Sequence, residues 1–275
     1  MGDELWSIED FENVLWDYGI SLPFPLHLGP SGPVGVSTSR SRTGRRVEDD
    51  IDALTQRWGP LRTRHLLTLV STLRTTVSSA FLYVVAEDRD EFDSRVTATA
   101  IVGDDRPIVV VESPTGIWIT MTPWDRLGTM LAGFLPQIPS WSFPTLSVRA
   151  EGLQSIAEMT TRSVPAATID RAMAREGFPM GLYRMMEKIS ERTVAHGFFG
   201  AAREDREGRQ LGDIAGDFVA APHGGFVRVQ EGGRILFEPL EPTALPSLLV
   251  RCLASVPAAR SSAEELRSPV VSRVH

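Results

Sequence analysis

An internal repeat at a spacing of 117 to 118 residues restricts the fold of this chain more than any single motif in it. The stretch TVSSAFLYVVAEDR at 76–89 recurs as TVAHGFFGAAREDR at 193–206. Two further matches lie before and after it on almost the same offset, from Ile51 to Ile169 and from Val109 to Val227. Chance agreement between amphipathic elements is the alternative, but three collinear matches favour a true duplication. We therefore expect two copies of one unit, related by pseudo-twofold symmetry.

Both copies show the same order of local patterns. Two short helices are expected first, over 47–59 and 61–76 in one copy and over 166–177 and 181–195 in the other. Short β-branched and aromatic runs separated by turn residues follow, which predict a meander of strands. The pair Gly232-Gly233 is typical of a tight hairpin turn. An apolar helix ends each copy, over 124–135 and 243–253.

This pattern predicts an internally duplicated α+β fold, with a central antiparallel β-sheet, flanking helical bundles and pseudo-twofold symmetry. We expect one structural domain over 1–257, with an N-terminal half of about 1–140 and a C-terminal half of about 165–257. The tail 258–275 is expected to be flexible.

Charge and hydropathy exclude several classes of partner. The 28 Lys and Arg residues are outnumbered by 35 Asp and Glu, and the net charge of −7 disfavours binding to nucleic acid. The N-terminus lacks the basic and apolar regions of a leader peptide, and no apolar stretch reaches 18 residues. We expect a cytoplasmic protein with no membrane insertion.

No catalytic, metal or cofactor site is expected from the motifs. The chain contains no phosphate-binding GxxxxGK[ST] or GxGxxG and no GxSxG nucleophile motif. Its five histidines are scattered singly, and Cys252 is its one cysteine. The acidic runs at 87–93 and 204–207 are interpreted as solvated loops, because they contain arginines and follow strands. Phe92, inside the first run, is better suited to a protein contact than to catalysis.

The C-terminal half resembles the signature of the EspG family, the cytosolic chaperones of ESX (type VII) secretion systems. The resemblance is carried by HGFFGAAREDREGR at 196–209 and ILFEPLEPTALPSLLVRCL at 235–253, and with weaker N-terminal similarity it extends over most of 4–256. The matching positions are His196, Gly197, Phe198, Gly200, Arg203, Asp205, Gly208, Arg209, Pro239 and 245–253. Asp217-Phe218, Gly224-Gly225-Phe226 and Ile235-Leu236-Phe237 depart from the family pattern.

The resemblance implies a chaperone that binds a PE–PPE heterodimer or a similar helical secretion substrate, keeps it soluble and delivers it to the secretion machinery. It also implies a binding surface made by the loop between the family's second and third strands, at 88–94 in this sequence, together with the C-terminal helices, at about 180–191. Carried onto this sequence, the partner-binding residues are Asp88, Arg89, Asp90, Glu91, Phe92, Asp93, Leu182, Tyr183, Met186 and Glu187.

Two points stay open at this stage. The apolar stripe formed by Leu182, Tyr183, Met186 and Ile189 suits either an exposed patch or buried core. A non-catalytic adaptor for other small helical substrates is a second interpretation of the function, and an enzyme on a duplicated scaffold is a third one that no residue set supports.

Overall fold

The structure, a computed structural model, describes residues 5–26, 28–29, 35–36, 44–74, 77–86, 94–103, 106–139, 141–205, 208–241 and 243–257. The predicted partner-binding loop at 88–93 lies outside the described residues, as does the tail 258–275. This loop holds Asp88, Arg89, Asp90, Glu91, Phe92 and Asp93.

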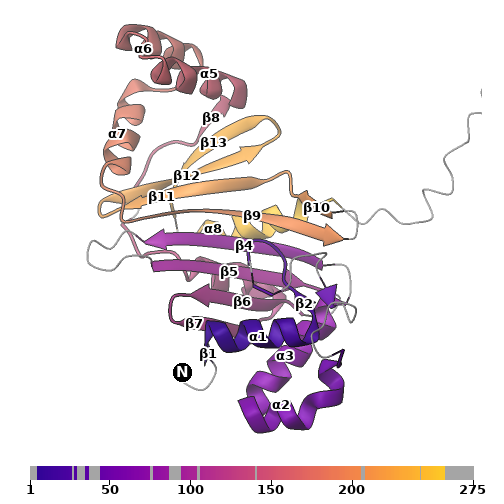
Figure 1. The fold of residues 1–275 in the computed structure, drawn as a ribbon. Helices are drawn as coiled ribbons and strands as arrows, with labels where there is room; N and C mark the ends of the chain where they lie inside the picture. The colour runs from indigo at the N-terminus through magenta and orange to yellow at the C-terminus, as the bar shows by residue number, and fades with distance from the viewer. Residues whose placement is uncertain are drawn as a thin grey trace, which may run out of the picture.

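One large antiparallel sheet forms the centre of the molecule (Figure 1). Among the described residues it has eleven strands, ten of them in the order β1-β7-β6-β5-β4-β9-β11-β12-β13-β8, and β10 pairs with β9 beside this path. Its strands are β1 (Leu5–Trp6), β4 (Val77–Ala86), β5 (Ser94–Val102), β6 (Ile108–Ser113), β7 (Gly116–Met121), β8 (Leu146–Arg149), β9 (Ala195–Asp205), β10 (Gly208–Leu211), β11 (Ala215–Ala221), β12 (Gly224–Glu231) and β13 (Arg234–Pro239). A separate short pair joins β2 (Ile20–Ser21) to β3 (Gly35–Val36).

Helices cover the two faces of this sheet unequally. The short helices α4 (Leu127–Ala132) and α8 (Leu245–Ala254) pack on one face, and α8 is visible behind the strands in Figure 1. The other face carries two separate helical groups, one at each end of the sheet. The first group is α1 (Ile8–Tyr18), α2 (Ile51–Trp58) and α3 (Pro60–Leu73), preceded by a 3₁₀ turn at Val47–Asp50. The second is α5 (Ala150–Thr161), α6 (Ala166–Arg175) and α7 (Met180–Ser190).

The apolar pattern of each strand reflects this covering. In β6 the consecutive residues Ile108, Val109, Val110 and Val111 are all buried, because they belong alternately to the clusters on the two faces. In the central strand β4, Leu82 packs under α4 and α8, whereas its neighbours in the chain point to the opposite face. The continuous buried run of β6 therefore identifies a strand that is covered on both faces.

The two halves of the sheet have matching registers. Ala100 lies opposite Val109 between β5 and β6, and the residues 118 positions later, Phe218 and Val227, lie opposite each other between β11 and β12. The halves meet where β4 pairs with β9, and there Leu82 lies opposite Phe199, 117 positions later. Outward from this central pair, the strands follow in chain order on both sides: β5, β6 and β7 beyond β4, and β11, β12 and β13 beyond β9.

The local predictions agree with these elements, except that some helix ends differ by a few residues: the helix expected over 181–195 ends at Ser190. Gly232 and Gly233, at φ 56° and 75°, make the hairpin between β12 and β13. Gly59, which follows α2, has a positive φ of 84°, but its ψ of 162° lies outside the left-handed helical region. The reason is Pro60, the first residue of α3, because a residue before proline avoids helical ψ values.

Candidate functional site

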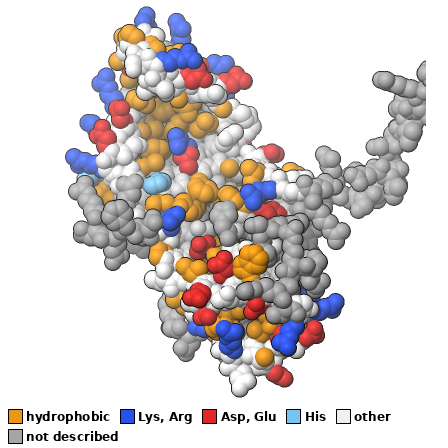
Figure 2. All heavy atoms as spheres, in the orientation of Figure 1, with side chains coloured by type: hydrophobic (Ala, Val, Ile, Leu, Met, Phe, Trp, Pro, Cys, Tyr) orange, Lys and Arg blue, Asp and Glu red, His pale blue; other side chains and the backbone are white. Residues whose placement is uncertain are grey.

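The middle of the sheet, between the two helical groups, presents a groove lined by aromatic side chains. Phe81 on β4 and Phe198 on β9 both point to this face. A cavity of about 970 Å³ lies along β9 and β11, and a second one of about 580 Å³ lies towards β5 and β6. Phe24 and Phe198 line both cavities, so the two hollows form one groove across the central strands. Figure 2 shows hydrophobic side chains exposed across the middle of this face.

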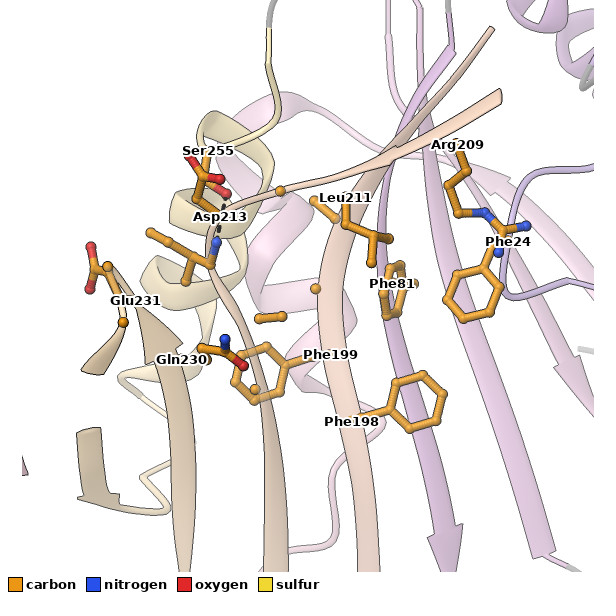
Figure 3. A pocket seen from close by; sticks show the side chains of 18 residues that line it. Phe24, Phe81, Phe198, Phe199, Arg209, Leu211, Asp213, Gln230, Glu231 and Ser255 are labelled. Carbon is orange, nitrogen blue, oxygen red and sulfur yellow. Dashed lines mark hydrogen bonds between the residues drawn. The ribbon is translucent and has the colours of Figure 1, made fainter. Parts of the chain in front are cut away.

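The aromatic rings of the groove contact one another in sequence (Figure 3). The ring of Phe24 meets that of Phe81 edge-on, with centroids 5.1 Å apart, and Phe81 lies 6.0 Å from Phe198. Tyr83 stacks on Phe198 at 4.8 Å with an interplanar angle of 26°. Such edge and offset-stacked contacts are the favoured arrangements of aromatic pairs. The groove wall is therefore one connected aromatic cluster, defined here by Phe24, Phe81, Tyr83 and Phe198.

Phe24 belongs to the N-terminal segment and is attached to the second half of the chain by polar contacts. Its backbone N–H donates to Glu204 Oε1 at 2.8 Å, and Arg209 Nε donates to the same oxygen at 3.0 Å. The guanidinium of Arg209 also lies 4.4 Å from the centroid of the Phe24 ring. The Glu204 side chain is only 12% exposed. The interpretation of 204–207 as a solvated loop is therefore wrong at Glu204, whose partner lies 180 positions earlier in the chain.

Two glycines beside the larger cavity make room for aromatic rings of the chain itself. Gly200 on β9 and Gly216 on β11 line the cavity. A Cβ on Gly216 would lie 2.5 Å from both the Arg228 carbonyl oxygen and the ring of Phe199, and a Cβ on Gly200 would lie 3.1 Å from Phe81 Cζ. A side chain at either position would therefore displace one of these rings.

The predicted loop 88–93 begins and ends close to the predicted helix. Ala86 at the end of β4 lies opposite both Ser94, the first residue of β5, and Ala195, the first residue of β9. Only four residues separate Ala195 from the end of α7 at Ser190. The described ends of this loop and the C-terminal end of α7 thus lie at the same end of the central strands (Figure 1).

The apolar stripe of α7 is core. Leu182 and Met186 are 7% and 6% exposed and pack with Ile189 against the sheet in one cluster with Phe226 and Phe237. Of the two interpretations that the sequence left open, buried core therefore holds for Leu182, Met186 and Ile189, because strands β11 to β13 cover them.

The exposed face of α7 carries other residues. Tyr183 is half-buried, with its ring 6.3 Å from that of Phe178, and Glu187 is exposed. Met185, which the sequence did not single out, is 41% exposed and lines a smaller cavity with Lys188. If α7 contacts a partner, it does so through these residues and not through Leu182 and Met186.

The strongly shifted pKa values lie outside the groove. Burial raises the pKa of Cys252 to about 12, and burial together with a hydrogen bond to Asp50 raises that of Tyr18 to about 12. Both residues belong to the core clusters. Within the described part of the chain, no group of three His, Cys, Asp or Glu side chains is placed to hold a metal ion. The described lining of the groove, which is largely aromatic and glycine-rich, is suited to binding apolar surface.

These features define an α+β binding protein, in which an antiparallel sheet carries an aromatic groove between two helical groups. The model of the EspG family matches residues 8–217, and the chain belongs to the EspG family. The fold is similar to that of the Mycobacterium tuberculosis type VII secretion system chaperone EspG5, solved in complex with a PE25–PPE41 dimer. That match has a TM-score of 0.67 at 9% identity and covers 93% of this chain and 97% of EspG5.

No curated protein matches the sequence significantly. None of the described helices is long and apolar enough to cross a membrane.

Proposed function

We propose that this protein is an ESX (type VII) secretion chaperone of the cytosol, which binds a PE–PPE-type helical heterodimer, keeps it soluble and delivers it to the secretion machinery. Family membership supports the proposal, as does the likeness to EspG5, whose structure holds a PE25–PPE41 dimer. The observation that carries it is the aromatic groove between the two helical groups. Exposed aromatic surface of this kind is typical of a protein-binding site.

The proposed binding surface has three parts that lie on one side of the sheet or at its end. The groove supplies the apolar centre through the exposed ring of Phe198 and the half-buried ring of Phe24. Tyr183 and Glu187 of α7 and the acidic segment 88–93 would extend it, because the ends of that segment lie near the end of α7. An apolar centre with a charged rim matches the usual anatomy of a protein interface.

A role in binding and not in catalysis follows from what the groove offers. Its lining is aromatic and glycine-rich, and two of its charged members, Arg209 and Glu231, are engaged with Glu204 and Arg251. The two residues with strongly raised pKa values, Cys252 and Tyr18, belong to the core clusters and do not line it. The chemistry available in the groove is thus desolvation and shape complementarity.

The duplicated origin of the fold is also part of this proposal. Matching registers on both sides of the β4–β9 pair support it, as does the contact of residues with their own equivalents near the centre. Contact between equivalent positions is what a twofold relationship produces at its axis. The proposed unit comprises 50–139 in the first half and 168–257 in the second.

Coexpression with candidate PE–PPE pairs, followed by size-exclusion chromatography, tests the function. We expect one stable complex in which a PE–PPE pair that is insoluble alone becomes soluble. If every pair elutes separately and single-helical-hairpin substrates coelute instead, the protein is an adaptor of another kind. If no helical substrate is retained, the chaperone proposal fails.

A further inference from the structure

Two phenylalanines of the groove occupy equivalent positions of the repeat and differ sharply in exposure. Phe81 on β4 and Phe198 on β9 are 117 positions apart and point to the same face of the sheet. Phe81 is 5% exposed, whereas Phe198 is 37% exposed. Two matching strand positions thus carry rings of different exposure, with Phe81 buried and Phe198 exposed.

The residue opposite Phe81 explains why its ring is buried. Phe81 lies across the strand pair from Gly200. A Cβ on that glycine would lie 3.1 Å from Phe81 Cζ, so the ring lies down over the space that a side chain would fill. Phe24 then packs edge-on against the same ring. An aromatic ring that covers a glycine on the neighbouring strand is a known stabilising pair in sheets.

The residue opposite Phe198 has the reverse effect. Phe198 lies across from Tyr83, whose own equivalent in the repeat is Gly200. The Tyr83 ring stacks on that of Phe198 at 4.8 Å and occupies the place on the strand where the phenylalanine would otherwise lie. Phe198 therefore stands out from the sheet because the repeat has tyrosine at 83 and glycine at 200.

The surroundings of Phe198 suit an anchor for a partner. It lines both cavities of the groove, so hollows of about 970 and 580 Å³ lie on its two sides. On β11 its cross-strand neighbour is Asp217, which accepts a hydrogen bond from Arg228 Nε at 2.6 Å. An aromatic side chain flanked by apolar hollows and by a polar pair is the arrangement found at interface hot spots.

We propose that Phe198 is the residue that inserts between apolar side chains of the helical client, and that Tyr83 is the positioning residue that holds its ring exposed. This inference rests on the proposed chaperone function. It also makes the groove asymmetric, because Phe198 is exposed to a client whereas its equivalent Phe81 is buried. A client with two similar helices would thus bind in one orientation across the sheet.

The positioning role can be tested without any client. 4-Fluorophenylalanine placed at position 198 gives a ¹⁹F NMR signal whose shift between H₂O and D₂O reports the exposure of the ring. We expect this solvent shift to fall by about half or more in Tyr83→Gly, because the ring can then lie on the strand, and to persist in Tyr83→Phe, which keeps the stacked ring. An unchanged solvent shift in Tyr83→Gly would overturn the positioning role.

The anchor role is tested with the PE–PPE pair that coexpression recovers. We expect Phe198→Ala to raise the Kd about 10-fold or more, as for an interface hot spot, and Tyr83→Gly to raise it while Tyr83→Phe leaves it near the wild-type value. Val250→Ala is the matched control, because Val250 is 48% exposed on α8, which covers the other face of the sheet. Circular dichroism of each variant checks that the fold is kept.

The outcomes separate the inference from the proposed function. If the wild type retains the client and Phe198→Ala binds equally well, the anchor assignment is wrong while the chaperone function stands. If the wild type retains no client, the function and the anchor role both fail, and the ¹⁹F measurement still decides the role of Tyr83. If the groove instead binds a second copy of this chain, Phe198→Ala will abolish a dimer seen by light scattering, and the client assignment is wrong.

Discussion

Gly128 of α4 lies directly against the backbone of Pro246 in α8, and these two residues occupy equivalent positions of the repeat, 118 apart. A Cβ on Gly128 would lie 2.9 Å from the Pro246 Cα and closer still to its carbonyl oxygen. On the sheet beneath these helices, Leu82 and Phe199 are likewise equivalent residues in contact. Contact between residues 117 or 118 positions apart therefore occurs in two layers of the molecule, as the proposed twofold relationship predicts.

The contact predicts an unusual cost for alanine at position 128. Gly128→Ala should destabilise the protein by about 1–3 kcal/mol, because the added methyl group overlaps backbone atoms that cannot rotate away. Gly181→Ala is the matched control, since Gly181 is also helical and has open space around its Cβ position. That change should stabilise by about 0.5–1 kcal/mol. Urea denaturation measures both, and equal effects would show that the α4–α8 contact is looser than described.

Glu204 should contribute to stability through the Phe24 segment. Glu204→Ala removes the acceptor shared by the Phe24 N–H and Arg209, and we expect a loss of about 1–3 kcal/mol. Hydrogen exchange at the Phe24 amide should become faster at the same time. Glu204→Gln is the control, because its amide oxygen can still accept the Phe24 bond. Unchanged exchange at Phe24 in the alanine variant would contradict the attachment.

Tyr18 predicts a loss of stability at alkaline pH. Burial and the hydrogen bond from its hydroxyl to Asp50 at 2.9 Å raise its pKa from 10.0 to about 12. A group whose pKa is raised on folding stabilises the folded state fully below its unfolded pKa and loses that contribution as pH rises through the folded value. Stability should therefore fall between pH 10 and 12, and less steeply in Tyr18→Phe. Urea midpoints across this range measure the effect, and parallel profiles for both proteins would argue against it.

Phe92 remains the sequence-based candidate for a contact in the 88–93 segment. Phe92→Ala should weaken client binding by about 1–3 kcal/mol without loss of stability. Reversing Asp90 and Asp93 to lysine should weaken it mainly at low ionic strength, because salt screens exposed charges over about 8 Å. Asp125→Lys is the control, since Asp125 is exposed next to α4, which packs on the other face of the sheet. A complex that none of these changes affects would place the interface elsewhere.

The sequence alone predicted the strand and helix order, the hairpin at Gly232-Gly233 and the family. These features depend on residues close together in the chain or on a repeat that can be read directly from it. The amphipathic pattern of α7 identified its apolar side correctly, but such a pattern cannot tell whether strands or solvent will cover that side. Only the packing of β11 to β13 on Leu182 and Met186 decided that the stripe is core.

The groove itself depended on tertiary structure for a similar reason. The exposure of Phe198 is decided by Tyr83, 115 positions earlier, and the role of Glu204 by Phe24, 180 positions earlier. No local pattern records such neighbours, since the cross-strand partner of a residue is set by the register of the folded sheet. The sequence by itself thus determined the elements and the offset at which similar patterns recur, and the folded sheet decided which side chains at matching positions are buried and which are exposed.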